Sequence, residues 1–74
     1  MRRAGTVVGA AQGVAVLRAA DDDPPGIGPA VVDETLTTVG RIVDVIGPVD
    51  APYLVVTMNE TSPTEYLGDV LYLR

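Results

Sequence analysis

The chain has 74 residues, which is enough for one small domain, residues 1–74, that buries about 60–65% of its unfolded surface. It contains no cysteine and no histidine, so disulfides and thiolate or imidazole metal sites are excluded and only carboxylates remain as ligands. Ten acidic residues stand against five basic ones, all arginine, with a formal net charge of -5. A basic patch for phosphates is therefore missing, and direct RNA or DNA binding is not expected as the main role.

The acidic balance has two explanations. It can be a surface charge that keeps a small protein soluble. It can also be an adaptation to high salt, in which hydrated carboxylates are screened from one another. The absence of lysine and the run Asp21-Asp22-Asp23 favour adaptation to high salt.

Short runs of Val, Ile, Leu and Thr between Gly- and Pro-rich turns predict an all-β domain. In chain order the expected strands are Arg3 to Ala10, Val14 to Ala19, Ala30 to Asp33, Leu36 to Ile46, Tyr53 to Met58 and Val70 to Leu73. Gln12-Gly13 and Glu34-Thr35 are expected turns, and residues 20–29 and 59–68 are expected loops. Six short antiparallel strands in so short a chain predict a small closed barrel, which removes exposed strand edges.

The expected strand from Leu36 to Ile46 does not alternate cleanly between apolar and polar residues. Val39, Arg41, Val43 and Val45 alternate with Gly40, Ile42, Asp44 and Ile46, so period two does not identify the buried side. A strand that serves two sheets, or that faces a partner on its outer side, would have this pattern. Gly40 is a candidate for a bend or bulge.

The opening residues, MRRAGTVVGAAQG, are too glycine-rich for a secretion signal, and no apolar run is long enough to span a membrane. We therefore expect a soluble cytoplasmic protein that has no contact with a membrane.

Catalytic and cofactor-binding motifs are missing. Asp44 is the one acid expected to be partly buried, although a strand residue of this kind more often points outward or bonds a neighbouring amide. Asp21, Asp22 and Asp23 lack the spacing of a calcium loop, and Ser62 has no base to activate it. No phosphate-binding glycine motif is present. We therefore expect no enzyme activity, no cofactor and no metal.

The turn that follows the longest expected strand is stiff and apolar. Gly47 can adopt a positive φ, Pro48 fixes its own φ, and Pro52 restricts the residue before it. The expected surface comprises Ile46, Gly47, Pro48, Val49, Pro52 and Tyr53. It is either a packed cap of the barrel or a rigid docking element, because a stiff apolar turn loses little entropy on binding.

The stretch VGRIVDVIGPVDAPYLVV, residues 39–56, resembles the signature of the small Gar-type subunit of H/ACA ribonucleoproteins (the Gar/Naf family) in its short archaeal form. The opening RRAGTVVGAAQGVAVLRA, the later VVDE and the final LGDVLYLR are similar to the same family, so the resemblance spans nearly the whole chain. Its most specific element is GPVDAPY. Ile46 stands where an aromatic residue is common, and the acidic balance and missing lysines differ from many relatives.

The resemblance implies a six-stranded barrel of the kind shared by some reductases and translation factors. It also implies a non-catalytic subunit that binds the catalytic subunit of the RNA-guided pseudouridine synthase. We expect the isolated chain to be a monomer. Such a subunit helps substrate RNA to load, take position and leave during ribosomal RNA processing, and it meets RNA only through the complex. The expected interface is Ile46, Gly47, Pro48, Val49, Pro52 and Tyr53. Val39, Arg41 and Val43, expected on one face of the preceding strand, are weaker candidates, and for the two valines core packing is at least as good an explanation.

Two other functions fit the same sequence. One is a related assembly factor of the same particle, although such factors carry long extra segments that this chain lacks. The other is a ribosome-maturation or translation-factor-type barrel that binds a ribosomal protein and would therefore sediment with ribosomal subunits.

Overall fold

A computed structural model describes residues 2–20, 25–59 and 62–74 of the chain. These residues form six strands and one short 3₁₀ helix, η1. The elements are β1 (Arg2–Ala11), β2 (Val14–Ala19), β3 (Ala30–Val32), β4 (Thr38–Ile46), β5 (Tyr53–Met58), η1 (Pro63–Tyr66) and β6 (Val70–Leu73). Each of the six predicted strands is present in the same order along the chain, and β4 begins later than predicted.

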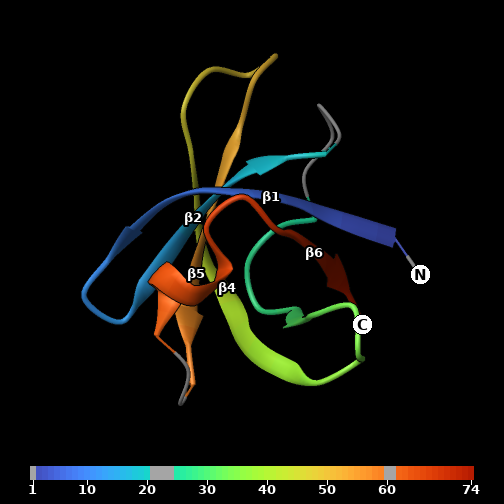
Figure 1. The fold of residues 1–74 in the computed structure, drawn as a ribbon. Coiled ribbons are helices and arrows are strands. Elements are labelled where there is room, and N and C mark those ends of the chain that lie inside the picture. Colours follow the sequence, from blue (N-terminus) through green and yellow to red (C-terminus); the bar gives the residue numbers. More distant parts are fainter. Residues whose placement is uncertain (1, 21–24, 60–61) are drawn as a thin grey trace.

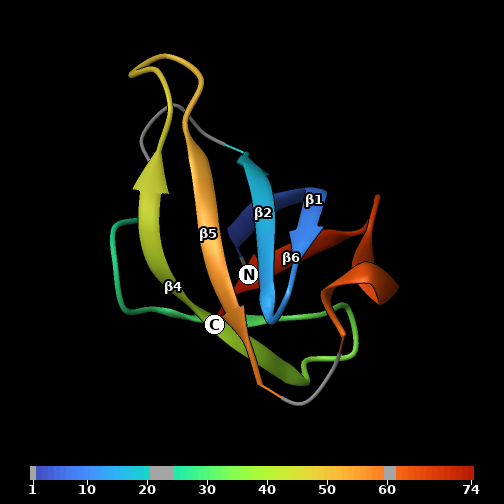
Figure 2. The same cartoon turned by 90° about the vertical axis from the view of Figure 1, so that its left-hand side faces the viewer.

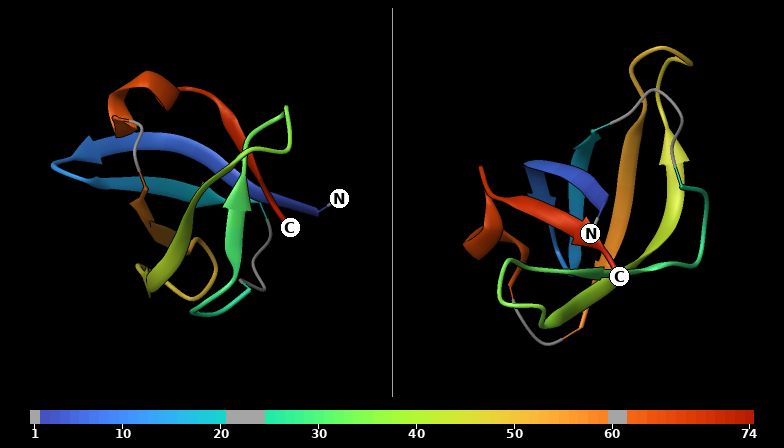
Figure 3. Two further views of the ribbon diagram at one scale, coloured as in Figure 1. Left: turned by 90° about the horizontal axis from the view of Figure 1, so that it is seen from below. Right: turned by 90° about the vertical axis from the view of Figure 1, so that its right-hand side faces the viewer.

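The strands close into an antiparallel barrel in the order β1-β2-β5-β4-β3-β6 (Figure 1). Figure 3 shows β1 beside β6, and Arg2 lies opposite Leu73 in the pairing of the first and last strands. The expected all-β closed barrel is thus confirmed.

Inward side chains from every strand fill the barrel. On β5 the alternation is regular, so that Leu54, Val56 and Met58 face the interior while Thr57 is exposed. The largest fully buried side chains are Leu17, Ile42, Leu54, Leu71, Val7, Val31, Val32, Val39 and Val56. Each such side chain stabilises the fold by about 1.5–3 kcal/mol relative to an exposed one.

Two bulges in β4 explain why its sequence does not alternate. Val39 is an extra residue opposite Val31 and Val32, and Val43 is an extra residue opposite β5. Each extra residue shifts the pleat by one position, so that inward positions occur at irregular spacing along the strand. The strand thus has one inner face, although period two could not identify it.

Gly40 lies beside the first of these bulges, as the sequence predicted. A Cβ atom on Gly40 would overlap with the carbonyl oxygen of Thr57 on β5. Only glycine allows this close approach of the two backbones.

The segment before β4 differs from the sequence prediction, which began the strand at Leu36. Residues 33–37 instead form a loop, in which Leu36 has a φ of 69° and therefore cannot continue a strand. The 3₁₀ helix η1 was also not predicted; it lies in the expected loop 59–68 and packs against β1.

Candidate protein-interaction surface

The β4–β5 hairpin carries the turn that the sequence singled out. Figures 1 and 2 show this hairpin extending beyond the barrel, with the turn 47–52 at its far end. Gly47 has a φ of 92°, and the amide of Ala51 donates a hydrogen bond to the Pro48 carbonyl at 3.2 Å. The turn therefore takes its shape from glycine, proline and one backbone bond.

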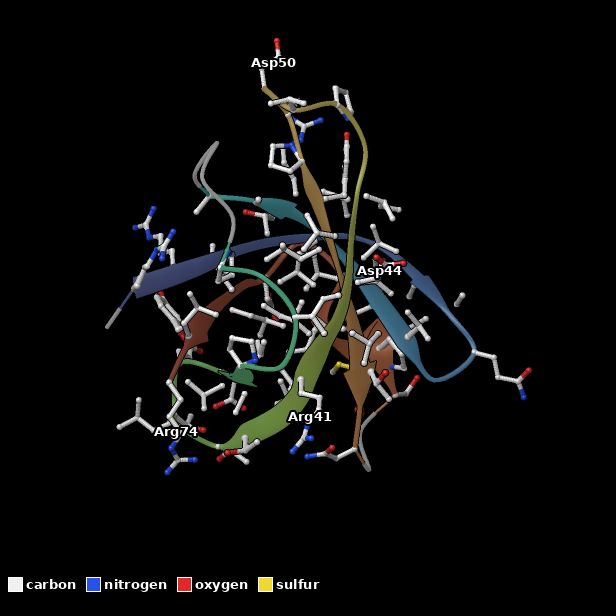
Figure 4. All side chains as sticks on the ribbon, turned by 180° about the vertical axis from the view of Figure 1, so that it is seen from behind. Arg41, Asp44, Asp50 and Arg74 are labelled. Carbon is white, nitrogen blue, oxygen red and sulfur yellow. The ribbon has the colours of Figure 1, made fainter. Side chains whose placement is uncertain are left out.

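The side chains at the end of this turn are open to solvent. Val49 is 93% exposed, Ile46 is 47% exposed, and Pro48 is also exposed. Figure 4 places Asp50 at the far end of the hairpin, remote from the barrel. We call Ile46, Pro48 and Val49 the hairpin tip. A Val exposed to this degree contributes nothing to the core.

Pro52 and Tyr53 pack at the end of the turn that joins the barrel. Pro52 is buried, and its carbonyl accepts a hydrogen bond from the Ala19 amide at 3.1 Å. Tyr53 is half-buried, and a Cβ on Gly47 would lie only 3.0 Å from its ring carbon Cδ1. The expected apolar surface therefore divides into an exposed tip and a packed root.

The residues of β4 do not share one face, contrary to the expectation for Val39, Arg41 and Val43. Val39 is 2% exposed and belongs to the core, which corrects its place among the interface candidates. Arg41 and Val43 are exposed. The extra residues in the strand reverse the direction of successive side chains, which could not be read from the spacing alone.

Asp44 is exposed, which agrees with the preferred interpretation of an outward or amide-bonded side chain and not with partial burial. Its Oδ1 accepts a hydrogen bond from the amide of the next residue, Val45, at 2.8 Å. This is the outward, amide-bonded alternative. Figure 4 shows Asp44 on β4 between Arg41 and the turn.

Asp33 is a structurally important acid that the sequence analysis missed. Its Oδ1 accepts hydrogen bonds from the Thr35 hydroxyl at 2.6 Å, the Thr35 amide at 2.9 Å and the Thr37 amide at 3.1 Å. The Tyr66 hydroxyl donates to Oδ2 at 3.1 Å and so ties the loop to η1. The hydroxyl of Thr35, with the two amides and Tyr66, lowers the pKa of Asp33 from its usual value of 3.8, although desolvation of the carboxylate opposes the shift.

The pattern Asp-x-Thr-x-Thr at residues 33–37 was the available signal, because Asp side chains often bond the amide two residues on. A pocket next to this loop is lined by residues of the 33–37 loop, η1 and β6, including Asp33, Glu34, Tyr66, Asp69 and Tyr72. Since Asp33 already accepts four hydrogen bonds, its carboxylate is committed to holding the loop.

Metal ligands do not gather in the described residues: no group of three Asp or Glu there could hold an ion. Asp21, Asp22 and Asp23, the weak calcium candidate, lie outside the described residues. Ser62 shares a hydrogen bond with the Thr64 hydroxyl at 2.8 Å. Among the described residues, no helix has the length and apolarity needed to cross a bilayer.

No protein-family model matches this chain, and no curated protein matches it.

Proposed function

We propose that this chain is a non-catalytic protein subunit of an H/ACA RNA-guided pseudouridine synthase. It binds the catalytic subunit and aids the loading, positioning and release of substrate RNA in ribosomal RNA pseudouridylation. The observation that carries the proposal is the hairpin tip, an exposed apolar end on a turn with the sequence GPVDAPY.

The shape of the turn supports a docking role. Gly47 and Pro48 stiffen it before any partner arrives, so that little conformational entropy remains to be lost on binding. Val49 is 93% exposed, so packing in the barrel does not explain why an apolar residue stands at this position. A stiff element with an unburied apolar end is a suitable anchor for a pocket on another protein.

The composition supports a role without direct chemistry or strong RNA contact. The chain has no His, Cys or Lys to serve as a nucleophile or base, and its net charge is -5. An acidic barrel is repelled by phosphates, so its contribution to an RNA-modifying particle comes through contact with another protein.

The test is a titration of this protein against the catalytic pseudouridine synthase subunit, in high potassium salt and without RNA. A Pro48→Asp, Val49→Asp double variant should weaken binding by about 30-fold or more, since the loss of a buried anchor residue typically lowers the affinity of an interface by at least that factor. The variant should stay folded and melt within a few degrees of the wild type, because the tip is solvated and only the stiffness that Pro48 gives the turn is lost.

The matched control is Leu36→Asp, Leu67→Asp, which adds the same two charges at exposed leucines far from the turn along the chain. This control should bind as the wild type does. No binding by the wild type would overturn the proposal. Sedimentation with ribosomal subunits would then favour a barrel that binds a ribosomal protein.

A further inference from the structure

The outer face of β2, β5 and β4 carries a row of valines across the strands. Val16 on β2 lies opposite Val55 on β5, and Val55 lies opposite Asp44 on β4. Both valines are half-buried on the outside of the barrel, because their neighbours Leu17, Leu54 and Val56 point inward.

Both ends of this row are bulges that add an outward valine. On β1, Val8 is the extra residue before Gly9, the partner of Val16, and it is 49% exposed. On β4, Val43 is the extra residue before Asp44, and it is 41% exposed. We call Val8, Val16, Val55 and Val43 the valine band. Four strands thus contribute one apolar strip to the outer surface.

The band is continuous with the hairpin tip. The next outward row toward the turn joins Arg18, Tyr53 and Ile46, of which Ile46 belongs to the tip. Successive outward rows are about 7 Å apart, which is within side-chain contact distance. Apolar surface therefore extends from the side of the barrel to Val49.

An arginine flanks the band on each side. Arg18 lies in the row nearer the turn, and Arg41 lies opposite Thr57 in the row beyond the band. The two positions are separated by about 14 Å along the strands and about 10 Å across them. Neither guanidinium meets a carboxylate within the described part of the chain.

Several of the described carboxylates lie elsewhere, whereas Asp50 lines a pocket together with Arg18 and Tyr53. Asp33, Glu34 and Asp69 line the pocket beside η1 and β6. On the band itself the carboxylate is Asp44, which is bonded to the Val45 amide. A chain with a net charge of -5 therefore has an apolar face flanked by two cations that form no ion pair with the residues the structure describes. This charge pattern complements an apolar protein surface with carboxylates at its rim.

We propose that the valine band is a second docking surface for the partner that binds the hairpin tip. It binds an apolar patch of that partner, and Asp or Glu residues surround this patch. This inference rests on the proposed function and enlarges its interface. A second copy of the chain is a poorer occupant, because it would bring two more arginines to a face that already carries Arg18 and Arg41 and would pair two chains of net charge -5.

The experiment is again a titration against the purified catalytic subunit of the pseudouridine synthase. Val16→Thr, Val55→Thr removes apolar surface while keeping β-branched shape, and should weaken binding about tenfold. Arg18→Glu, Arg41→Glu should weaken binding by about tenfold or more, because each reversed charge would repel the carboxylates at the partner's rim. This second variant is measured at the lowest salt in which the protein stays folded, since salt screens such charges. Thermal melts check that each variant is folded.

Val70→Thr is the matched control, since Val70 is a half-buried valine on β6, away from the band. It should bind as the wild type does. If the wild type binds and the tip variant does not, but both band variants bind normally, the proposed function stands and the band proposal is wrong. If the wild type does not bind, both are wrong. Sedimentation equilibrium tests the remaining alternative. If the wild type is a dimer and the Val16→Thr, Val55→Thr variant is a monomer, the band proposal is also wrong, because a second copy of the chain would then bind the band.

Discussion

The two ends of β4 carry loops that are held by different means. Before the strand, residues 33–37 are fixed by the Asp33 carboxylate, which accepts hydrogen bonds from Thr35, Thr37 and Tyr66. After it, residues 47–52 are fixed by Gly47, by proline and by one backbone hydrogen bond. The first loop is held together by hydrogen bonds from its own side chains, whereas the second leaves the side chains of Pro48 and Val49 exposed.

This difference separates a structural loop from the loop that we propose for docking. A side chain that bonds its own loop can contact a partner only at the cost of those bonds. A turn stiffened through its backbone keeps its shape while Val49 remains available. The loop of residues 33–37 is therefore part of the scaffold, and the hairpin tip is the surface that we propose for recognition.

The largest expected effect is on β4 itself, which both loops share. Gly40→Ala should destabilise the protein by about 3 kcal/mol, because the added methyl group overlaps with the Thr57 carbonyl and cannot be relieved by a side-chain shift. Denaturant melts measure the loss. Gly9→Ala is the control, since its Cβ would lie 3.8 Å from the nearest atom, on Val16, and should change stability by less than about 1 kcal/mol. Equal losses in both variants would contradict the close approach of β4 and β5.

Removal of the Asp33 charge should loosen the first loop. Asp33→Asn should lower the melting temperature by several degrees at neutral pH, because the carboxylate accepts four hydrogen bonds. The folded pKa of Asp33 is lowered, so its contribution is present above the ordinary value of 3.8 and is lost as the pH falls below it. Melts of the two proteins should therefore converge in acid.

The control for this prediction is Glu34→Gln, which removes a charge from the next residue, an exposed side chain. It should leave the neutral-pH melt nearly unchanged. A wild-type and Asp33→Asn difference that persisted unchanged well below pH 3.8 would show that the carboxylate charge does not hold the loop.

Leu36→Gly should stabilise the protein by about 0.5 kcal/mol, since glycine adopts the φ of 69° without the strain of a side chain. Leu36 is 58% exposed, so little packing is lost. Leu67→Gly provides the contrast, because Leu67 is 49% exposed but has an ordinary φ of -54°. This variant should therefore be less stable than the wild type. Denaturant midpoints compare the two variants, and a loss at both positions would contradict strain at Leu36.

The smallest expected effect on stability is at the second loop. Val49→Ser should change the free energy of unfolding by less than about 0.5 kcal/mol, because the side chain is 93% exposed. The same chemical denaturation measurement applies. A larger loss would mean that Val49 packs against the barrel, and the contrast between the two loops would then disappear.

The strands were predictable because short β-branched runs ended at Gly, Pro and Asp, and those signals are local. The bulges at Val39 and Val43 were not, because a bulge depends on the register of the neighbouring strand. The bond between Tyr66 and Asp33 spans 33 positions and is equally invisible to local patterns. For the site, the turn around Val49 was predictable from glycine and proline, but exposure of Val49 and burial of Pro52 depend on how the turn sits against the rest of the barrel, including β2.

The barrel closes through a short seam, in which β3 pairs with β6 at Val31 with Leu73 and at Val32 with Tyr72, and the Arg74 amide donates a hydrogen bond to the Ala30 carbonyl at 3.3 Å. The β4–β5 ladder runs from Gly40 to Ile46. Since short ladders open first in local unfolding, the barrel should breathe at the seam while the β4–β5 hairpin stays intact. The protein should thus loosen transiently at the seam while the hairpin tip, which we propose for docking, keeps its shape.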